Sequence, residues 1–317
     1  MANLPNKLFY YLKPVMPRKM QLFLRRLIAR YKRKKYAHIW PIDPHAATPP
    51  AGWKGWPDGK QFALVIMHDV DTQIGHDKCS KLMDLEEGLG MRSTFNVVPE
   101  RYKVSGQLLK DIKSRGFGLG VHGLNHDGKL FLTYDGFRKK AAKINEYIKS
   151  WDAKGFSSPS MHHRLEWMHH LDIESSTSTF DTDPFEPQSD AIGTIFPFIV
   201  QNDPAREGFV EMPYTLPQDF TLYIILHEKN IDIMKTKLDW IVKNKGMALF
   251  NTHPDYMDFS DGKQRRYEEY PVSLYKEFLL YIKNSYAGNY WDALPHDMAI
   301  YLKSNGNSSI TFKAKGK

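Results

Sequence analysis

The stretch FALVIMHDVD, from Phe62 to Asp71, decides the fold of this chain. Its first six residues are all apolar, which is typical of a strand covered on both faces. Two acids follow, Asp69 and Asp71, and residues two apart in an extended segment point to the same side. Two acids beside a buried strand are costly unless a cation neutralises them, although a solvated turn is the simpler alternative. The stretch therefore predicts a buried strand that ends at a charged site.

Around this stretch the chain alternates apolar strands with amphipathic helices. Further strands are expected at residues 93–98, 118–121, 208–212, 221–226 and 247–251. Helices are expected at residues 78–89, 107–115, 135–149 and 231–243. Such alternation predicts an α/β fold with a mostly parallel sheet, open or closed into a barrel. Ligands in these folds gather beyond the carboxyl ends of the strands, so reactive side chains there are the candidates for a site.

A second predicted strand ends at a pair of histidines, His122 and His126, in the segment HGLNHDG. Histidines four apart meet on one face of a helical turn and can both reach one ion. The chain has 13 histidines, so the spacing alone is weak evidence. The position directly after a strand, among glycines that let the backbone turn, favours a metal site.

A third apolar strand runs into His253, in the segment ALFNTHPD at residues 248–255. A hydrogen-bonded structural histidine would explain this ending by itself. Three such endings in one chain favour a shared site. Imidazoles combined with a carboxylate suit zinc, and cobalt, nickel, manganese and iron are the alternatives.

The ordered motifs resemble the NodB-homology polysaccharide deacetylases, carbohydrate esterase family 4, over about residues 60 to 260. They are Asp-x-Asp after a strand, then His-x-x-x-His, then Thr-His-Pro after a late strand. The segment STFDTDPF at residues 178–185 is similar to a later acidic and aromatic motif of that family. The resemblance implies a distorted (β/α) barrel that hydrolyses an N-acetyl group on an amino sugar or polysaccharide precursor.

The resemblance also implies a role for each candidate residue. The ligands of the divalent metal would be Asp71, His122 and His126. Asp69 would be the base that takes a proton from water, and His253 the acid that protonates the leaving amine. The two aspartates are often adjacent in the family, whereas Val70 separates them here. An exchange of base and ligand between them therefore stays open.

One position departs from the family. Ser157, in the segment GFSSP, stands where the family has an arginine that steadies the catalytic aspartate. Arg164 is either a replacement for it or a surface charge. Three hypotheses follow. They are a deacetylase acting on a carbohydrate or glycan, a metal-dependent hydrolase of a non-sugar amide, and a catalytically silent glycan-binding barrel held at the membrane surface.

The first 55 residues are expected to form a basic arm in front of a catalytic domain at residues 56–317. Residues 1–42 hold 11 of the 44 basic residues and no acid, which leaves 33 basic and 36 acidic residues elsewhere. The nearly neutral body gives no indication of nucleic-acid binding. Residues 18–35 predict a basic amphipathic helix, which could lie on an anionic membrane or pack its apolar stripe on the body. The stripe consists of Met20, Phe23, Leu24, Leu27, Ile28 and Tyr31.

The remaining signals concern the compartment. Cys79 is the only cysteine, so the chain has no internal disulfide. No apolar run approaches the roughly 20 residues that span a bilayer, and the start of the chain lacks the pattern of a secretory signal. We therefore expect a cytoplasmic protein, with peripheral attachment to the inner membrane face as the alternative.

Overall fold

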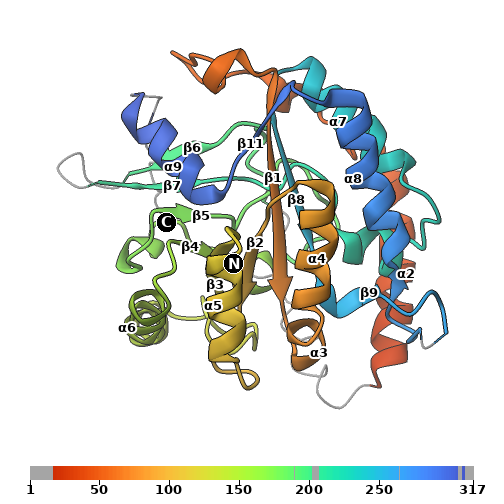
Figure 1. Cartoon of the computed structure of the whole chain (residues 1–317), viewed down its shortest axis with the longest axis horizontal. Coiled ribbons are helices and arrows are strands. Elements are labelled where there is room, and N and C mark those ends of the chain that lie inside the picture. The colour runs from red at the N-terminus through yellow and green to blue at the C-terminus, as the bar shows by residue number, and fades with distance from the viewer. Residues whose placement is uncertain (1–16, 189, 202–206, 264, 306–308, 311–317) are drawn as a thin grey trace.

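The sheet that carries the site is curled and mostly parallel (Figure 1). The computed structural model describes residues 17–188, 190–201, 207–263, 265–305 and 309–310. The strand order is β11-β1-β2-β3-β4-β5-β7-β6-β12, and β8 also pairs with β1. The strands are β1 (Phe62–Val70), β2 (Thr94–Val97), β3 (Gly118–His122), β4 (Gly155–Ser157), β5 (Ser175–Ser176), β6 (Phe198–Val200), β7 (Phe209–Glu211), β8 (Met247–Thr252), β11 (Tyr290–Asp292) and β12 (Ser309–Ile310). A second, two-stranded sheet joins β9 (Met257–Asp258) to β10 (Tyr270–Pro271).

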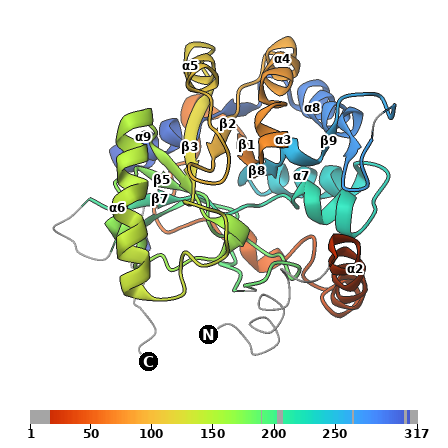
Figure 2. The same ribbon diagram turned by 90° about the horizontal axis from the view of Figure 1, so that it is seen from below.

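Helices surround these strands, as the view along the barrel in Figure 2 shows. They are α2 (Arg18–Lys35), α3 (Gln73–His76), α4 (Cys79–Leu89), α5 (Gly106–Ser114), α6 (Tyr134–Trp151), α7 (Asp232–Lys243), α8 (Val272–Tyr286) and α9 (Pro295–Ser304). Local signals fix several ends. Ser105 and Thr133 accept backbone N–H bonds at the starts of α5 and α6, and Gly90 ends α4 with a φ of 72°. The prediction of a distorted (β/α) barrel is confirmed.

Strand β1 lies at the centre of the core. All nine of its residues are buried, and it pairs in parallel with β2, β8 and β11. Each fully buried Leu, Ile or Phe side chain contributes roughly 1.5–3 kcal/mol relative to exposure. In a parallel sheet these neighbours end at the same edge, so the side chains that follow β1, β3 and β8 meet there.

The strand expected at residues 221–226 is wrong. This run is a π-helical turn, η6 (Phe220–Ile225), and its apolar residues are buried. A short buried apolar run has the same composition in a strand and in a helix, so its pattern cannot separate the two. Asp219 begins the turn by accepting the N–H of Phe220 at 2.7 Å. Residues 155–157, which were not among the predicted strands, form β4 beside β3.

The basic helix α2 lies against the body through its cations. Arg18 pairs with Glu268 at 2.7 Å, and Arg26 donates to the carbonyl of Ile224 at 3.0 Å. The residues of its apolar stripe are exposed. The alternative in which this stripe packs on the body is therefore wrong. None of the described helices combines the length and hydrophobicity needed to cross a bilayer.

Candidate active site

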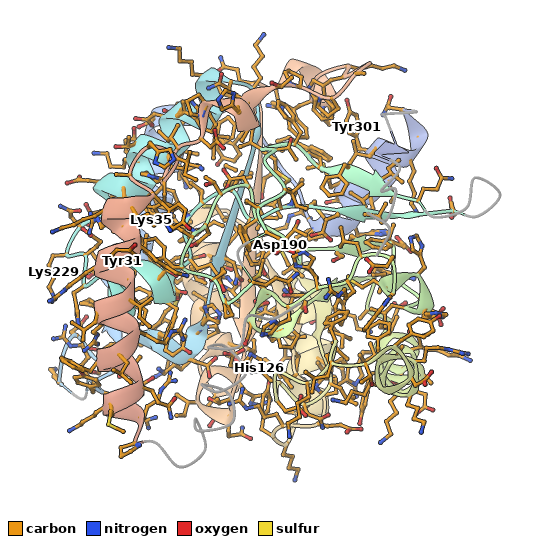
Figure 3. The ribbon with its side chains drawn as sticks, turned by 180° about the vertical axis from the view of Figure 1, so that it is seen from behind. Tyr31, Lys35, His126, Asp190, Lys229 and Tyr301 are labelled. Carbon is orange, nitrogen blue, oxygen red and sulfur yellow. The ribbon has the colours of Figure 1, made fainter. Side chains whose placement is uncertain are left out.

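The first cluster at the carboxyl edge consists of Asp71, His122 and His126, whose ligand atoms all lie within 4.8 Å of one another. Asp71 Oδ1 lies 3.1 Å from Nε2 of His126 and 3.4 Å from Nε2 of His122. Figure 3 marks His126 toward the end of the barrel at which β1 finishes. The structure thus brings together the three residues expected to be ligands.

The donor set fits a divalent cation. Asp71 Oδ1 is buried and has no hydrogen-bond partner among the described residues, although two ring nitrogens face it. A shared cation would satisfy all three atoms. Nδ1 of His122 hydrogen-bonds to the carbonyl of Ser157 at 3.1 Å, so this nitrogen carries the proton and Nε2 keeps its lone pair for a metal. Burial raises the pKa of Asp71, but the two histidines lower it further, well below its usual range.

The four-residue spacing predicted that His122 and His126 lie on one helical turn. This prediction is wrong. His122 is the last residue of β3, and His126 lies in the following loop. Gly123 has a φ of 62° and His126 a φ of 53°, which bend the chain back toward β3. A Cβ at Gly123 would lie 2.4 Å from Pro159, so glycine is required there for space as well as for conformation.

Asp69 is held by four neutral donors instead of an arginine. Its Oδ1 accepts from Nδ2 of Asn96 at 2.9 Å, and its Oδ2 from Nδ2 of Asn251 at 3.0 Å. The hydroxyls of Ser157 and Tyr214 lie 3.3 Å from Oδ2. We call these residues the neutral cage. Among the described residues no arginine contacts Asp69, and Arg164 does not replace the family's arginine.

Of the four residues in the neutral cage, only Ser157 was a candidate from the sequence. Asn96 and Asn251 are amides beside apolar residues in predicted strands, which is a signal that could have identified them. Tyr214 gives no such signal, because it comes from the segment after β7. Burial, and then the charge of Asp69, raise the pKa of Tyr214 well above its usual range. Tyr214 therefore stays protonated and can donate.

On the other side of the site His253 pairs with a buried carboxylate, that of Asp219. His253 Nδ1 lies 2.7 Å from Oδ1 of Asp219, and its backbone N–H donates to Oδ2 at 2.8 Å. Tyr270 donates a third bond to Oδ2 at 3.0 Å. Burial lowers the pKa of His253, but Asp219, followed by Asp71 and Asp69, raises it to about 10. His253 is therefore protonated at neutral pH and can donate. The sequence did not indicate Asp219, because the run that follows it was predicted to be a strand.

A further carboxylate, that of Asp255, links the segment after β8 to the segment after β1. It accepts the backbone N–H of Asp71 at 2.9 Å and the hydroxyl of Thr72 at 2.5 Å. Burial, and then the neighbouring charge of Asp71, raise its pKa to about 6. A Cβ at Gly75 would lie 2.1 Å from the Asp255 carboxylate, so the absent side chain leaves room for this contact. Asp255 thus fixes the backbone that presents Asp71.

His126 is the least buried of the three residues in the cluster. That residue borders a surface hollow together with Asn125, Asp127 and His162. Asp71, His122 and His253 are nearly buried. The hollow therefore meets the cluster at His126, and neither Asp71 nor His122 lines it.

Comparisons with known proteins support the fold. No family profile and no curated protein match the sequence. A solved structure from Mycobacterium smegmatis, assigned as a polysaccharide deacetylase, has a TM-score of 0.62 and 14% identity, covering 85% of this chain and 99% of its own. A Puue allantoinase structure has a TM-score of 0.59 and 13% identity, covering 84% and 98%. One from Pseudomonas aeruginosa PAO1, also assigned as a polysaccharide deacetylase, has a TM-score of 0.55 and 13% identity, covering 83% and 95%.

Proposed function

We propose that this chain, whose fold is that of the polysaccharide deacetylases, is a metal-dependent amide hydrolase. It removes an N-acetyl group from an amino sugar or a polysaccharide precursor. The observation that carries the proposal is the cluster of Asp71, His122 and His126, with its unsatisfied carboxylate oxygen. The groups on either side of it, Asp69 and His253, can divide the proton transfers of an amide hydrolysis.

The metal would be held by the Asp71, His122 and His126 side chains. A divalent ion, zinc by the donor set, lowers the pKa of water and polarises a carbonyl. The remaining residues supply positions and protons. The carbonyl of Ser157 fixes the tautomer of His122, and Asp255 fixes the backbone of Asp71. Both ligands are therefore oriented before any substrate arrives.

Hydrolysis forms a C–O bond and breaks the C–N bond of the amide, and two proton transfers accompany these changes. Asp69 takes a proton from the attacking water while a C–O bond forms at the acetyl carbon. The C–N bond then breaks, and the His253 imidazolium gives its proton to the amine nitrogen. Acetic acid and a free amine result, and the acid loses its proton at neutral pH. Proton exchange with solvent then returns Asp69 to the carboxylate and His253 to the imidazolium. The pKa of about 10 keeps His253 charged at neutral pH, as this step requires.

A second candidate function is hydrolysis of a non-sugar amide. The likeness to a structure described as an allantoinase favours it, because that protein shares the fold at a similar TM-score. The same metal cluster and the same proton groups would serve both substrates. The difference lies in the substrate and not in the mechanism, so only a substrate panel separates the two.

The test is release of carboxylate or amine from a panel of N-acetylated amino sugars and non-sugar amides, using zinc-loaded full-length chain. We expect acetate from at least one amino sugar, loss of release on chelation, and recovery on adding zinc. Release only from non-sugar amides would select the second candidate. A zinc-loaded chain that hydrolyses no member of the panel would contradict hydrolysis and favour a silent glycan-binding barrel.

A further inference from the structure

Helix α2 turns its apolar stripe away from the protein. The side of α2 that faces the body carries Leu22 and Ala29, which are buried. At 100° per residue the apolar stripe lies on the opposite side of the helix. An amphipathic helix of a globular protein ordinarily does the reverse. The outward apolar stripe of α2 therefore indicates a binding partner other than the described residues.

Polar contacts fix this orientation. Besides the pairs of Arg18 and Arg26, Lys32 donates to the carbonyl of Pro184 at 2.6 Å and Arg33 pairs with Glu228 at 2.6 Å. The guanidinium of Arg25 lies over the ring of Phe220, 4.8 Å from its centre. These contacts are spread along the helix from its first turn to its last. Rotating the stripe inward would break all of them, so the outward stripe is the stable arrangement.

The stripe is the largest concentration of exposed apolar side chains among the described residues. Six of the twelve exposed large hydrophobic residues belong to α2, with exposed fractions between 36% and 66%. They are Met20, Phe23, Leu24, Leu27, Ile28 and Tyr31. Figure 3 shows Tyr31 and Lys35 on this helix at the edge of the molecule. Contiguous exposed apolar surface of this kind marks an interaction site.

Exposed cations flank the stripe. Lys19 and Arg30 lie along one side of it, and Lys34 and Lys35 lie at its end. The whole helix holds nine Lys and Arg residues and no acid. An apolar stripe bordered by cations matches the boundary of an anionic bilayer, where acyl chains lie beneath negative headgroups. Two copies of α2 set face to face would instead bring like charges together, which disfavours a second copy.

We propose that α2 docks on the surface of an anionic lipid bilayer, with Phe23 and Ile28 entering the headgroup boundary and the flanking cations contacting the lipid headgroups. The helix also lies beside the site. The ring of Phe220, under Arg25, is 4.9 Å from that of Tyr256, which is 5.3 Å from the ring of His253. The side of α2 opposite the stripe therefore faces the site through Phe220 and Tyr256. The docking surface does not depend on the proposed hydrolysis.

The experiment is co-sedimentation of the full-length chain with vesicles of phosphatidylcholine alone and of phosphatidylcholine with phosphatidylglycerol. We expect binding to the anionic vesicles that weakens as salt rises, because screening reduces the attraction between cations and headgroups. The variant Phe23→Gln with Ile28→Gln should bind about tenfold more weakly or worse, since each loses apolar contact with the lipid. The variant Lys34→Glu with Lys35→Glu should also bind more weakly.

Matched controls separate docking from general surface effects. Leu132→Gln with Ile300→Gln removes two equally exposed apolar side chains elsewhere, and Lys110→Glu with Lys139→Glu reverses two exposed charges elsewhere. Both controls should bind as the unaltered chain does. The proposal would be overturned if the stripe variant bound as tightly as the unaltered chain. It would also be overturned if the unaltered chain bound neutral and anionic vesicles equally. So would a dimer in light scattering that the stripe variant converts to a monomer, because a second copy would then cover the stripe.

Discussion

The two sides of the metal cluster hold their proton-handling groups in opposite ways. Asp69 is surrounded by uncharged donors, whereas His253 is paired with a buried carboxylate. The neutral donors orient the Asp69 carboxylate without placing a positive charge beside it. The Asp219 charge, in contrast, holds the proton on the imidazole of His253. This difference agrees with the proposed roles, in which Asp69 accepts a proton and His253 gives one.

The largest effect is expected from removing the proton donor. His253→Gln keeps a donor near Asp219 but cannot carry a proton to the amine. We expect turnover to fall about 10³-fold while bound zinc is unchanged, because general-acid catalysis is worth 10²–10⁴. Acetate release and zinc analysis of the same sample measure both. The control is His296→Gln, at a half-exposed histidine remote from the site. Unchanged turnover in His253→Gln would remove the donor role.

The next effect is expected from the carboxylate behind the donor. Asp219→Asn removes the charge that raises the pKa of His253, so that pKa falls from about 10 toward its ordinary value. The protonated form is then lost at a lower pH. The alkaline limb of the turnover profile should move to lower pH, with roughly 10²-fold lower turnover above neutrality. Asp239→Asn, an exposed carboxylate with two tyrosine donors, should leave the profile unchanged. An unmoved limb in Asp219→Asn would contradict the contrast between the two sides.

The variant Ser157→Arg tests whether the neutral cage has room for the arginine of the family. Ser157 is fully buried and lies 3.2 Å from the hydroxyl of Tyr214. Ser157→Arg should therefore overpack the site and lower the unfolding free energy by about 1–3 kcal/mol. Denaturant unfolding measures this loss, with the exposed Ser150→Arg as control. A stable and more active Ser157→Arg would show that the cage is only a weakened form of the arginine site.

The smallest effect is expected from a single member of the neutral cage. Tyr214→Phe removes one of four donors and leaves the ring in place, so we expect turnover to fall only about threefold to tenfold. Tyr281→Phe, which loses a hydroxyl contact to the remote Asp239, is the control. A loss as large as that of His253→Gln would mean that Tyr214 has a role beyond holding Asp69.

The sequence predicted the parts of the site that follow strands directly. A continuous apolar run identifies β1 and β8, and the residues after them follow from chain position alone. The cage is different, because Asn96, Asn251 and Tyr214 meet at Asp69 only through the pairing of separate strands. Asp219 stayed hidden since the run after it has the composition of a strand and forms a π-helical turn. The composition of a segment does not show which distant residues its side chains will contact in the fold.

The orientation of α2 escaped prediction for a related reason. Amphipathic spacing shows that a helix has two faces, but it does not show which face meets the body. In this chain, long cationic side chains reach carbonyls and carboxylates across the interface, as those of Arg26 and Arg33 do. Pairing of this kind depends on where η6 and its neighbours lie. Only the assembled structure reveals it.

The central claim is that Asp71, His122 and His126 form a metal site that serves hydrolysis. The most direct measurement is zinc bound per chain after equilibration with zinc and dialysis, for the unaltered chain, Asp71→Ala and the exposed control Asp77→Ala. We predict close to one zinc per chain for the unaltered chain and for Asp77→Ala. Asp71→Ala should bind almost none, because removing the carboxylate leaves two neutral imidazoles. Full zinc retention in Asp71→Ala would contradict the claim.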